Sequence, residues 1–218
     1  PMQARVPDVP GWSRVGPAGP SPPATRSALE QPGTPGDDLG MGFGGSLVND
    51  AVKFDFVLEG AGWANCSLTV GAQAFEMSGV SYCTDALADL IRVATLMAAG
   101  HNVATISFDG EPREWRWMFQ RHWFDDLKGR QEGLRIRILG FYDISEQAPE
   151  AEGQLKFEAA CDPDDFARAV EQVADRIWSE LGTAGYAQVW GMEPFPTRAL
   201  VALKAALASP PEFTTMLT

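Results

Sequence analysis

The chain contains few of the residues from which metal sites and many catalytic sites are built. Its 218 residues include two histidines, His101 and His122, and three cysteines, Cys66, Cys83 and Cys161. No C-x-x-C pair occurs, and no pair of these residues has the spacing of a zinc site. We therefore predict neither a metal nor a cofactor. We interpret the thiols as small core residues of a protein in a reducing compartment, the cytoplasm.

Basic side chains are also scarce. Lysine and arginine together number 17 against 29 aspartates and glutamates, which gives a net charge of −12. Nucleic acids and anionic membranes bind dense basic surfaces, so we expect neither as a partner. The most apolar stretch, residues 86–99, is interrupted by Asp89 and Arg92 and is too short to predict a membrane span. We see no signal-peptide pattern at the N-terminus.

The first 50 residues differ from the rest in composition. They hold nine of the 16 prolines and nine of the 22 glycines and show no apolar periodicity. Such a segment buries too little surface to offset its ordering entropy, so we expect a disordered leader over residues 1–50. An alternative reading starts the natural chain at Met41. Gly40, Gly42 and Gly45 match G-x-G-x-x-G, but no strand precedes them, so we read the match as coincidence.

Apolar periodicity begins at residue 52 and predicts ten elements. Alternation predicts strands over residues 53–58, 63–70, 73–80, 103–108, 113–121, 134–141 and 154–161. Helical spacing predicts three helices. The first follows Thr84, the second follows Asp162 as N-cap and ends at Gly182, and the last follows Pro196. A charged loop should span residues 122–133 and an acidic loop residues 143–153.

The order of these elements predicts the fold class. Consecutive strands with short links favour antiparallel pairing. We therefore predict an α+β domain over residues 51–208, followed by a tail over residues 209–218. It should have one antiparallel sheet of about six to seven strands, with one helix inserted after the N-terminal strands and two C-terminal helices. The helices should lie mainly on one face of the sheet.

A row of basic residues is the candidate binding face. Trp117 should pair near Ile136, and Ile136 near Phe157, if the apolar faces are to coincide. The other face then carries the candidate residues in two rows: Arg116, Arg137 and Lys156, and beside them Arg135 next to Glu158. Like charges that face each other are destabilising, so such a row predicts an anion or an acidic partner. Alternatively, the side chains extend into water, or Glu114 and Glu158 neutralise them.

Other constellations have simpler structural readings beside their functional ones. Acidic residues flank the strand over residues 113–121 and could catalyse hydrolysis or hold Mg²⁺, but charged loops are usually solvated. Trp115 and Trp117 share an apolar face and fit a core better than a ligand-stacking platform. A dyad of Cys83 and His101 stays open, because catalytic partners meet in space and need not be neighbours in sequence.

Two stretches resemble small uncharacterised proteins of high-GC bacteria. They are DALADL at residues 85–90 and FDGEPREWRW at residues 108–117, and the resemblance covers roughly residues 52–207. These motifs are structural, a helix start and a turn into an aromatic strand, and they imply no catalytic residue. In character, as small acidic α+β proteins, such chains are similar to immunity proteins that neutralise partner toxins.

These observations favour a binding protein. We predict a cytoplasmic protein-binding domain of unknown partner, of immunity type, which acts by covering a partner surface. The alternative is an enzyme or ligand-binding domain that holds a small anion on the basic face. No motif predicts a catalytic residue, and nothing in the sequence indicates the oligomeric state.

Overall fold

The computed structural model describes residues 51–126, 129–191 and 193–209. All of them belong to the unit that spans residues 42–218. The predicted leader over residues 1–50, with Met41 and the glycine pattern, lies outside the described residues, as do residues 210–218 of the predicted tail. The predicted domain boundaries stay predictions.

The first three strands form an antiparallel sheet in chain order. They are β1 (Val52–Gly60), β2 (Trp63–Val70) and β3 (Gln73–Ser81). A tight turn at Gly71 and Ala72 joins β2 to β3, and Gly71 has a φ of 56° that residues with a side chain seldom adopt. Alternate residues of these strands are buried, which confirms that one face of this sheet lines the core.

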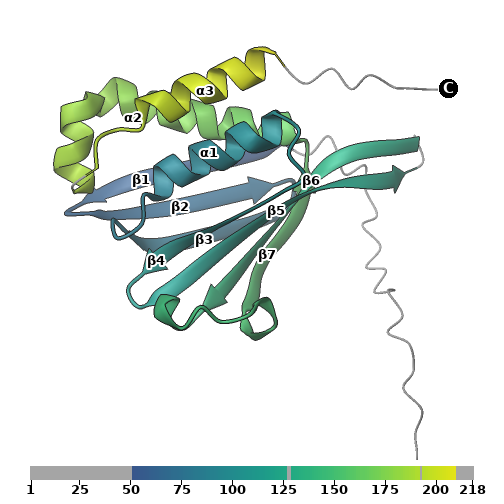
Figure 1. Cartoon of the computed structure of the whole chain (residues 1–218), viewed down its shortest axis with the longest axis horizontal. Helices are drawn as coiled ribbons and strands as arrows, with labels where there is room; N and C mark the ends of the chain where they lie inside the picture. Colours follow the sequence, from purple (N-terminus) through teal and green to yellow (C-terminus); the bar gives the residue numbers. More distant parts are fainter. Residues whose placement is uncertain (1–50, 127–128, 192, 210–218) are drawn as a thin grey trace, which may run out of the picture. The chain divides into compact units, whose positions relative to one another are not determined.

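The last four strands form a second antiparallel sheet, again in chain order. They are β4 (Val103–Gly110), β5 (Arg113–Asp126), β6 (Gly129–Phe141) and β7 (Gln154–Cys161). The charged loop predicted over residues 122–133 was wrong, because β5 and β6 continue through most of it and extend beyond their neighbours (Figure 1). Ladder hydrogen bonds join main-chain groups and need no apolar side chain, so strands can pair where the sequence shows no apolar alternation.

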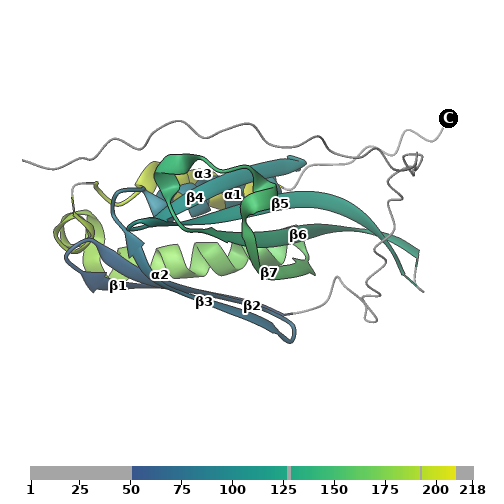
Figure 2. The same cartoon turned by 90° about the horizontal axis from the view of Figure 1, so that it is seen from below.

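The prediction of a single sheet was also wrong. The seven strands form two sheets, of three and four strands, and no pairing joins β3 to β4 (Figure 2). The α+β class and the antiparallel pairing are confirmed. Alternation reports only that one face of a strand is buried, which is equally true of one sheet and of two sheets around a shared core.

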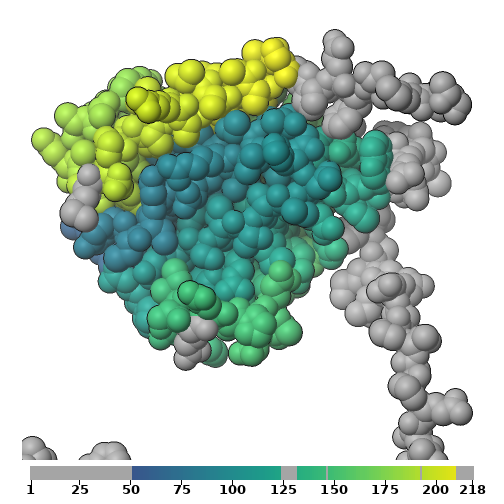
Figure 3. All heavy atoms as spheres, in the orientation of Figure 1, coloured from purple at the N-terminus to yellow at the C-terminus, as the bar shows by residue number. Residues whose placement is uncertain are grey.

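Three helices lie along one side of the two sheets (Figure 1) rather than over one face of a single sheet. They are α1 (Ala86–Ala98), α2 (Pro163–Trp190) and α3 (Thr197–Ala208). α1 contacts β4 and both other helices, and α2 contacts β1. Side chains of α1 and α3 meet along the two helices in the space-filling view (Figure 3).

The start of α2 is as predicted, and so is the end of its first helical segment. Asp162 is the N-cap, and its carboxylate accepts hydrogen bonds from the amides of Asp164 at 2.8 Å and Asp165 at 3.3 Å. Gly182 interrupts the helix with a φ of 61° and a ψ of −172°, after which helical structure resumes as far as Trp190. Gly182 therefore ends the first helical segment, as predicted, and a short second segment that the sequence did not predict follows it.

The core lies between the inner faces of the two sheets and the apolar sides of the helices. Trp117 is fully buried, which confirms its prediction as a core residue. Phe75, from β3, makes edge-on contacts with Trp115 and Trp117 of β5, so aromatic rings join the two sheets. Trp115 is partly buried and packs against this core.

Candidate functional site

The four predicted basic residues all lie on the outer face of the second sheet, but in a different register. Trp117 pairs with Ile138, not Ile136, so Arg116 lies opposite Leu139. Arg137 lies between Met118 and Glu158. The predicted row of Arg116, Arg137 and Lys156 was therefore wrong. A slip of two residues keeps the same side chains on the buried face, so alternation cannot detect it.

Arg116 is largely buried, with 15% of its side chain exposed, and binds groups of its own sheet and of the loop before β7. Its guanidinium donates to both carboxylate oxygens of Glu114, at 2.7 and 2.9 Å, and to the carbonyl of Ala148 at 2.8 Å. The guanidinium also lies 4.2 Å from the centre of the Phe141 ring. Glu114 is only 2% exposed and accepts a further hydrogen bond from Ser107. These contacts occupy Arg116 within the protein.

The other three basic residues have polar neighbours as well. Arg135 forms an ion pair with Glu158, although Glu158 lies opposite Arg137 and Arg135 lies opposite Ala160. Lys156 donates to the side-chain oxygen of Gln154 at 2.6 Å. Arg137 is the least satisfied, since its nearest carboxylates, on Glu150 and Glu158, are 3.9 and 4.0 Å away. Its Nε is buried with no hydrogen-bond partner among the described residues.

The predicted acidic loop helps to neutralise this face. It contains two short 3₁₀ helices, η1 (Ile144–Glu146) and η2 (Glu150–Glu152). Its main chain supplies the acceptor at Ala148, and η2 supplies the Glu150 carboxylate beside Arg137. The outer face is therefore largely balanced by charges of the same chain, which was the alternative reading of the sequence.

The free edge of β1 is a feature that the sequence did not reveal. Among the described strands, β1 pairs only with β2, and alternate residues of such a strand direct both main-chain groups away from the partner. The amide of Gly71 donates to the carbonyl of Ala51 at 3.3 Å, so the main-chain groups of the next residue, Val52, point away from β2. In β1, the residues whose main-chain amide and carbonyl point away from β2 are Val52, Phe54, Phe56 and Leu58.

Two side chains occupy the middle of this edge. The Asp55 carboxylate accepts a hydrogen bond from the amide of Phe56 at 2.8 Å, which confirms that this amide points away from β2. Arg176, from α2, donates to the carbonyl of Phe56 at 3.0 Å and to the Asp55 carboxylate at 2.6 Å. Together they satisfy the groups that a neighbouring strand would otherwise bind.

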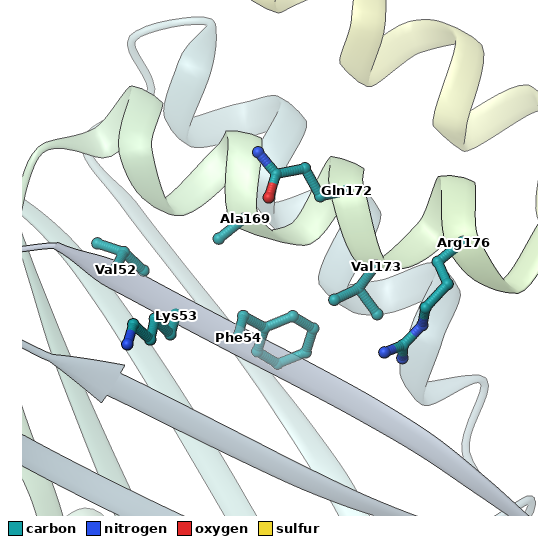
Figure 4. Close-up of a pocket in the computed structure, with 7 residues that line it drawn as sticks. All are labelled: Val52, Lys53, Phe54, Ala169, Gln172, Val173 and Arg176. Atoms are coloured by element: carbon teal, nitrogen blue, oxygen red, sulfur yellow. The ribbon is translucent and has the colours of Figure 1, made fainter.

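A pocket lies on each side of Arg176, in the groove between β1 and α2. The first, of about 300 Å³, is lined by Val52, Lys53 and Phe54 of β1 and by residues of α2 (Figure 4). The second, of about 330 Å³, is lined by Phe56 to Leu58, Glu180 and other residues of α2 and its end. We call this feature the β1–α2 groove.

One signal in the sequence could have pointed to the groove. Arg176 lies directly beside Ile177 and three positions after Val173, within the apolar stripe of the predicted helix. A cation so placed must reach a polar group at the edge of the core. The sequence does not show that β1 is an edge strand, because the alternation of apolar and polar residues carries no information about the order of strands in a sheet.

The structure does not bring Cys83 and His101 together as a dyad. Cys83 precedes α1 and His101 follows it, so a 13-residue helix, about 20 Å long, lies between them. Cys83 instead lies 3.5 Å from the Glu111 carboxylate. Burial raises the pKa of the Cys66 and Cys161 thiols, which are core residues as predicted, whereas Cys83 is exposed and its prediction as a core residue was wrong. Within the described part of the chain, no group of three or more acidic, cysteine or histidine residues could hold a metal ion.

No protein-family model, curated protein or solved structure matches the chain. In residues 51–126, 129–191 and 193–209, no helix has both the length and the apolar character that crossing a bilayer would require.

Proposed function

We propose that this chain is a protein-binding domain that takes up an extended segment of a partner in the β1–α2 groove. The observation that carries the proposal is the set of outward-facing main-chain groups at Val52, Phe54 and Leu58, beside two pockets. A peptide that adds a strand to a sheet edge gains affinity from main-chain hydrogen bonds and specificity from pockets for alternate side chains. The groove offers both.

The partner is a protein of the same compartment. The three cysteines are free thiols, which supports the cytoplasm as that compartment. The similarity in character to immunity proteins makes a toxin one candidate partner, bound through a segment that becomes a fourth strand of the first sheet. The net charge of −12 supports a partner other than a nucleic acid.

Selection from a random library of ten-residue peptides, displayed on phage, tests this proposal. We expect enriched peptides to bind the parent chain and to lose affinity roughly fivefold to tenfold on Val52→Pro. Proline at the first residue of an edge strand removes an outward amide and leaves the β1–β2 hydrogen bonds in place. Failure to enrich any peptide would overturn the proposal.

Val103→Pro is the matched control. Val103 begins β4, which is an edge strand of the second sheet. The amide of Arg121 donates to the carbonyl of Asn102 at 2.7 Å, so the amide of Val103 also points outward. Peptides should bind this variant as they bind the parent. Equal losses of peptide affinity in Val52→Pro and Val103→Pro would show that the peptides do not bind specifically at the edge of β1.

Analytical ultracentrifugation of the free chain tests a second copy as the occupant. We expect no association that depends on β1. A monomer–dimer equilibrium that Val52→Pro abolishes would assign this edge to self-association and overturn the proposal.

A second candidate function rests on Arg137. Its Nε is buried without a hydrogen-bond partner among the described residues, and its nearest carboxylates, on Glu150 and Glu158, are 3.9 and 4.0 Å away. Thermal shifts with phosphate, sulfate and citrate, on the parent and on Arg137→Gln, test it. Stabilisation that depends on anion concentration and is lost in the variant supports a bound anion. Identical shifts in both proteins exclude one at Arg137.

A further inference from the structure

We infer that the segment bound in the β1–α2 groove is acidic, with a carboxylate side chain that lies between Lys53 and Arg176. The inference rests on the proposed function and names the chemistry of the partner. It follows from how the free protein already satisfies the middle of the β1 edge, and from the charges that line the groove.

The free protein places a carboxylate of its own where a partner strand would lie. Asp55 Oδ1 accepts from the amide of Phe56 at 2.8 Å, while Arg176 donates to the carbonyl of the same residue at 3.0 Å. A strand that pairs here must take over both main-chain groups of Phe56. Asp55 and Arg176 are 43% and 41% exposed as side chains, so both can turn away without leaving a buried charge.

Once a partner strand donates to the carbonyl of Phe56, Arg176 has N–H donors that are free to bind another group. Its guanidinium carries five N–H groups in a planar fork, of which the Asp55 carboxylate can occupy two. A carboxylate on the incoming segment can occupy others. Lysine or arginine at this position would instead face a like charge.

The residues that line the first pocket also favour an acidic side chain on the bound segment. Among the described residues that line it, the charged ones are Lys53 and Arg176, and none is acidic. With the Asp55 carboxylate, which pairs with Arg176, these groups still carry one net positive charge, in a chain of net charge −12. Towards the far end of the groove Glu180 lines the second pocket with Arg176, so positive charge is concentrated at the Val52 end. The segment should therefore be acidic near Val52 and neutral or basic near Leu58.

Peptide selection on charge variants tests this inference. Peptides selected on the parent should be enriched in aspartate or glutamate at one position. Replacement of that residue by glutamine should weaken binding roughly fivefold to tenfold, less so at high salt. Selection on Lys53→Glu should remove the acidic preference. Lys204→Glu is the control, since Lys204 pairs with Asp175 between α3 and α2 and does not line either pocket of the groove.

The outcomes separate this inference from the proposed function. Acidic preference on the parent and on Lys204→Glu, but not on Lys53→Glu, supports the inference. Peptides that require an intact Val52 amide but show no acidic preference would overturn it while the groove remains a strand-binding site. An acidic preference that disappears equally in Lys204→Glu would reflect overall charge and would also overturn it.

Discussion

Arg176, on α2, donates a hydrogen bond to the main-chain carbonyl of Phe56 on the free edge of β1, with 3.0 Å between the two atoms. An unpaired strand edge is a template for unwanted pairing, and charged side chains are a common means of covering one. Here the cover consists of Arg176 and Asp55, whose contacts cross from the second helix to the first strand. Because both side chains are partly exposed, the cover is removable.

The first prediction concerns this cover. Asp55→Ala removes the acceptor of the Phe56 amide, so hydrogen exchange at that amide should become roughly fivefold to tenfold faster. The amide of Val57, which points towards β2, serves as the control in the same spectrum and should keep its protection. Equal acceleration at both amides would indicate opening of the whole strand instead.

The second prediction concerns the start of α2. Asp162→Ala should lower the free energy of unfolding by about 1 kcal/mol, because the amides of Asp164 and Asp165 lose their acceptor. Asp162→Asn retains an oxygen in the same place and should cost much less. Urea denaturation measures both. An alanine variant as stable as the parent would show that the helix does not depend on this cap.

The third prediction separates buried from exposed ion pairs on the outer face. Glu114→Gln should destabilise the protein by about 3 kcal/mol, because it leaves the largely buried guanidinium of Arg116 without its counter-charge. Arg135→Gln removes a pair in which Arg135 is 43% exposed, and it should cost about 1 kcal/mol or less. Chemical denaturation of the two variants measures which substitution lowers the free energy of unfolding more. Equal costs would contradict the prediction.

The fourth prediction uses two carboxyls with opposite pKa shifts. Burial raises the pKa of Asp85, the carboxylates of Asp89 and Glu193 add to this, and Arg92 opposes it. Hydrogen bonds from Ser145 lower the pKa of Asp143, at the start of η1. The stability due to Asp85 is therefore present below its unfolded pKa and lost as pH rises through the folded one. For Asp143 it is present above the unfolded pKa and lost as pH falls.

Asparagine variants test the direction in which each carboxyl group changes stability with pH. Relative to the parent, Asp85→Asn should gain stability as pH rises from about 3 to 6, and Asp143→Asn should lose stability over the same range. Unfolding free energies at a series of pH values check both. Parallel pH profiles for the two variants would contradict the assigned causes of the shifts.

The sequence predicted most local structure because the local signals agree. The strand over residues 154–161 and the Asp162 cap followed by Pro163 were placed correctly from periodicity and capping chemistry. Pairing was harder to predict. The slip that sets Trp117 against Ile138 and the division into two sheets both preserve the alternation from which they would have to be inferred.

The candidate site was the least predictable part. Arg116, Arg135, Arg137 and Lys156 were rightly expected on one face. Their neutralisation by Glu114, Glu158 and the acidic loop depends on tertiary contacts between residues up to 32 positions apart. The groove joins residues about 120 positions apart, Asp55 and Phe56 with Arg176, and no local pattern relates them.

Amide hydrogen exchange of the complex tests the account most directly. A peptide selected from the library is added to saturation, and exchange is followed residue by residue by NMR. The account predicts new protection, about tenfold or more, at the outward amides of Phe54 and Leu58, with little change at Val57, which is already bonded to β2. Protection confined to β4 or to the outer face of the second sheet, with β1 unchanged, would contradict it.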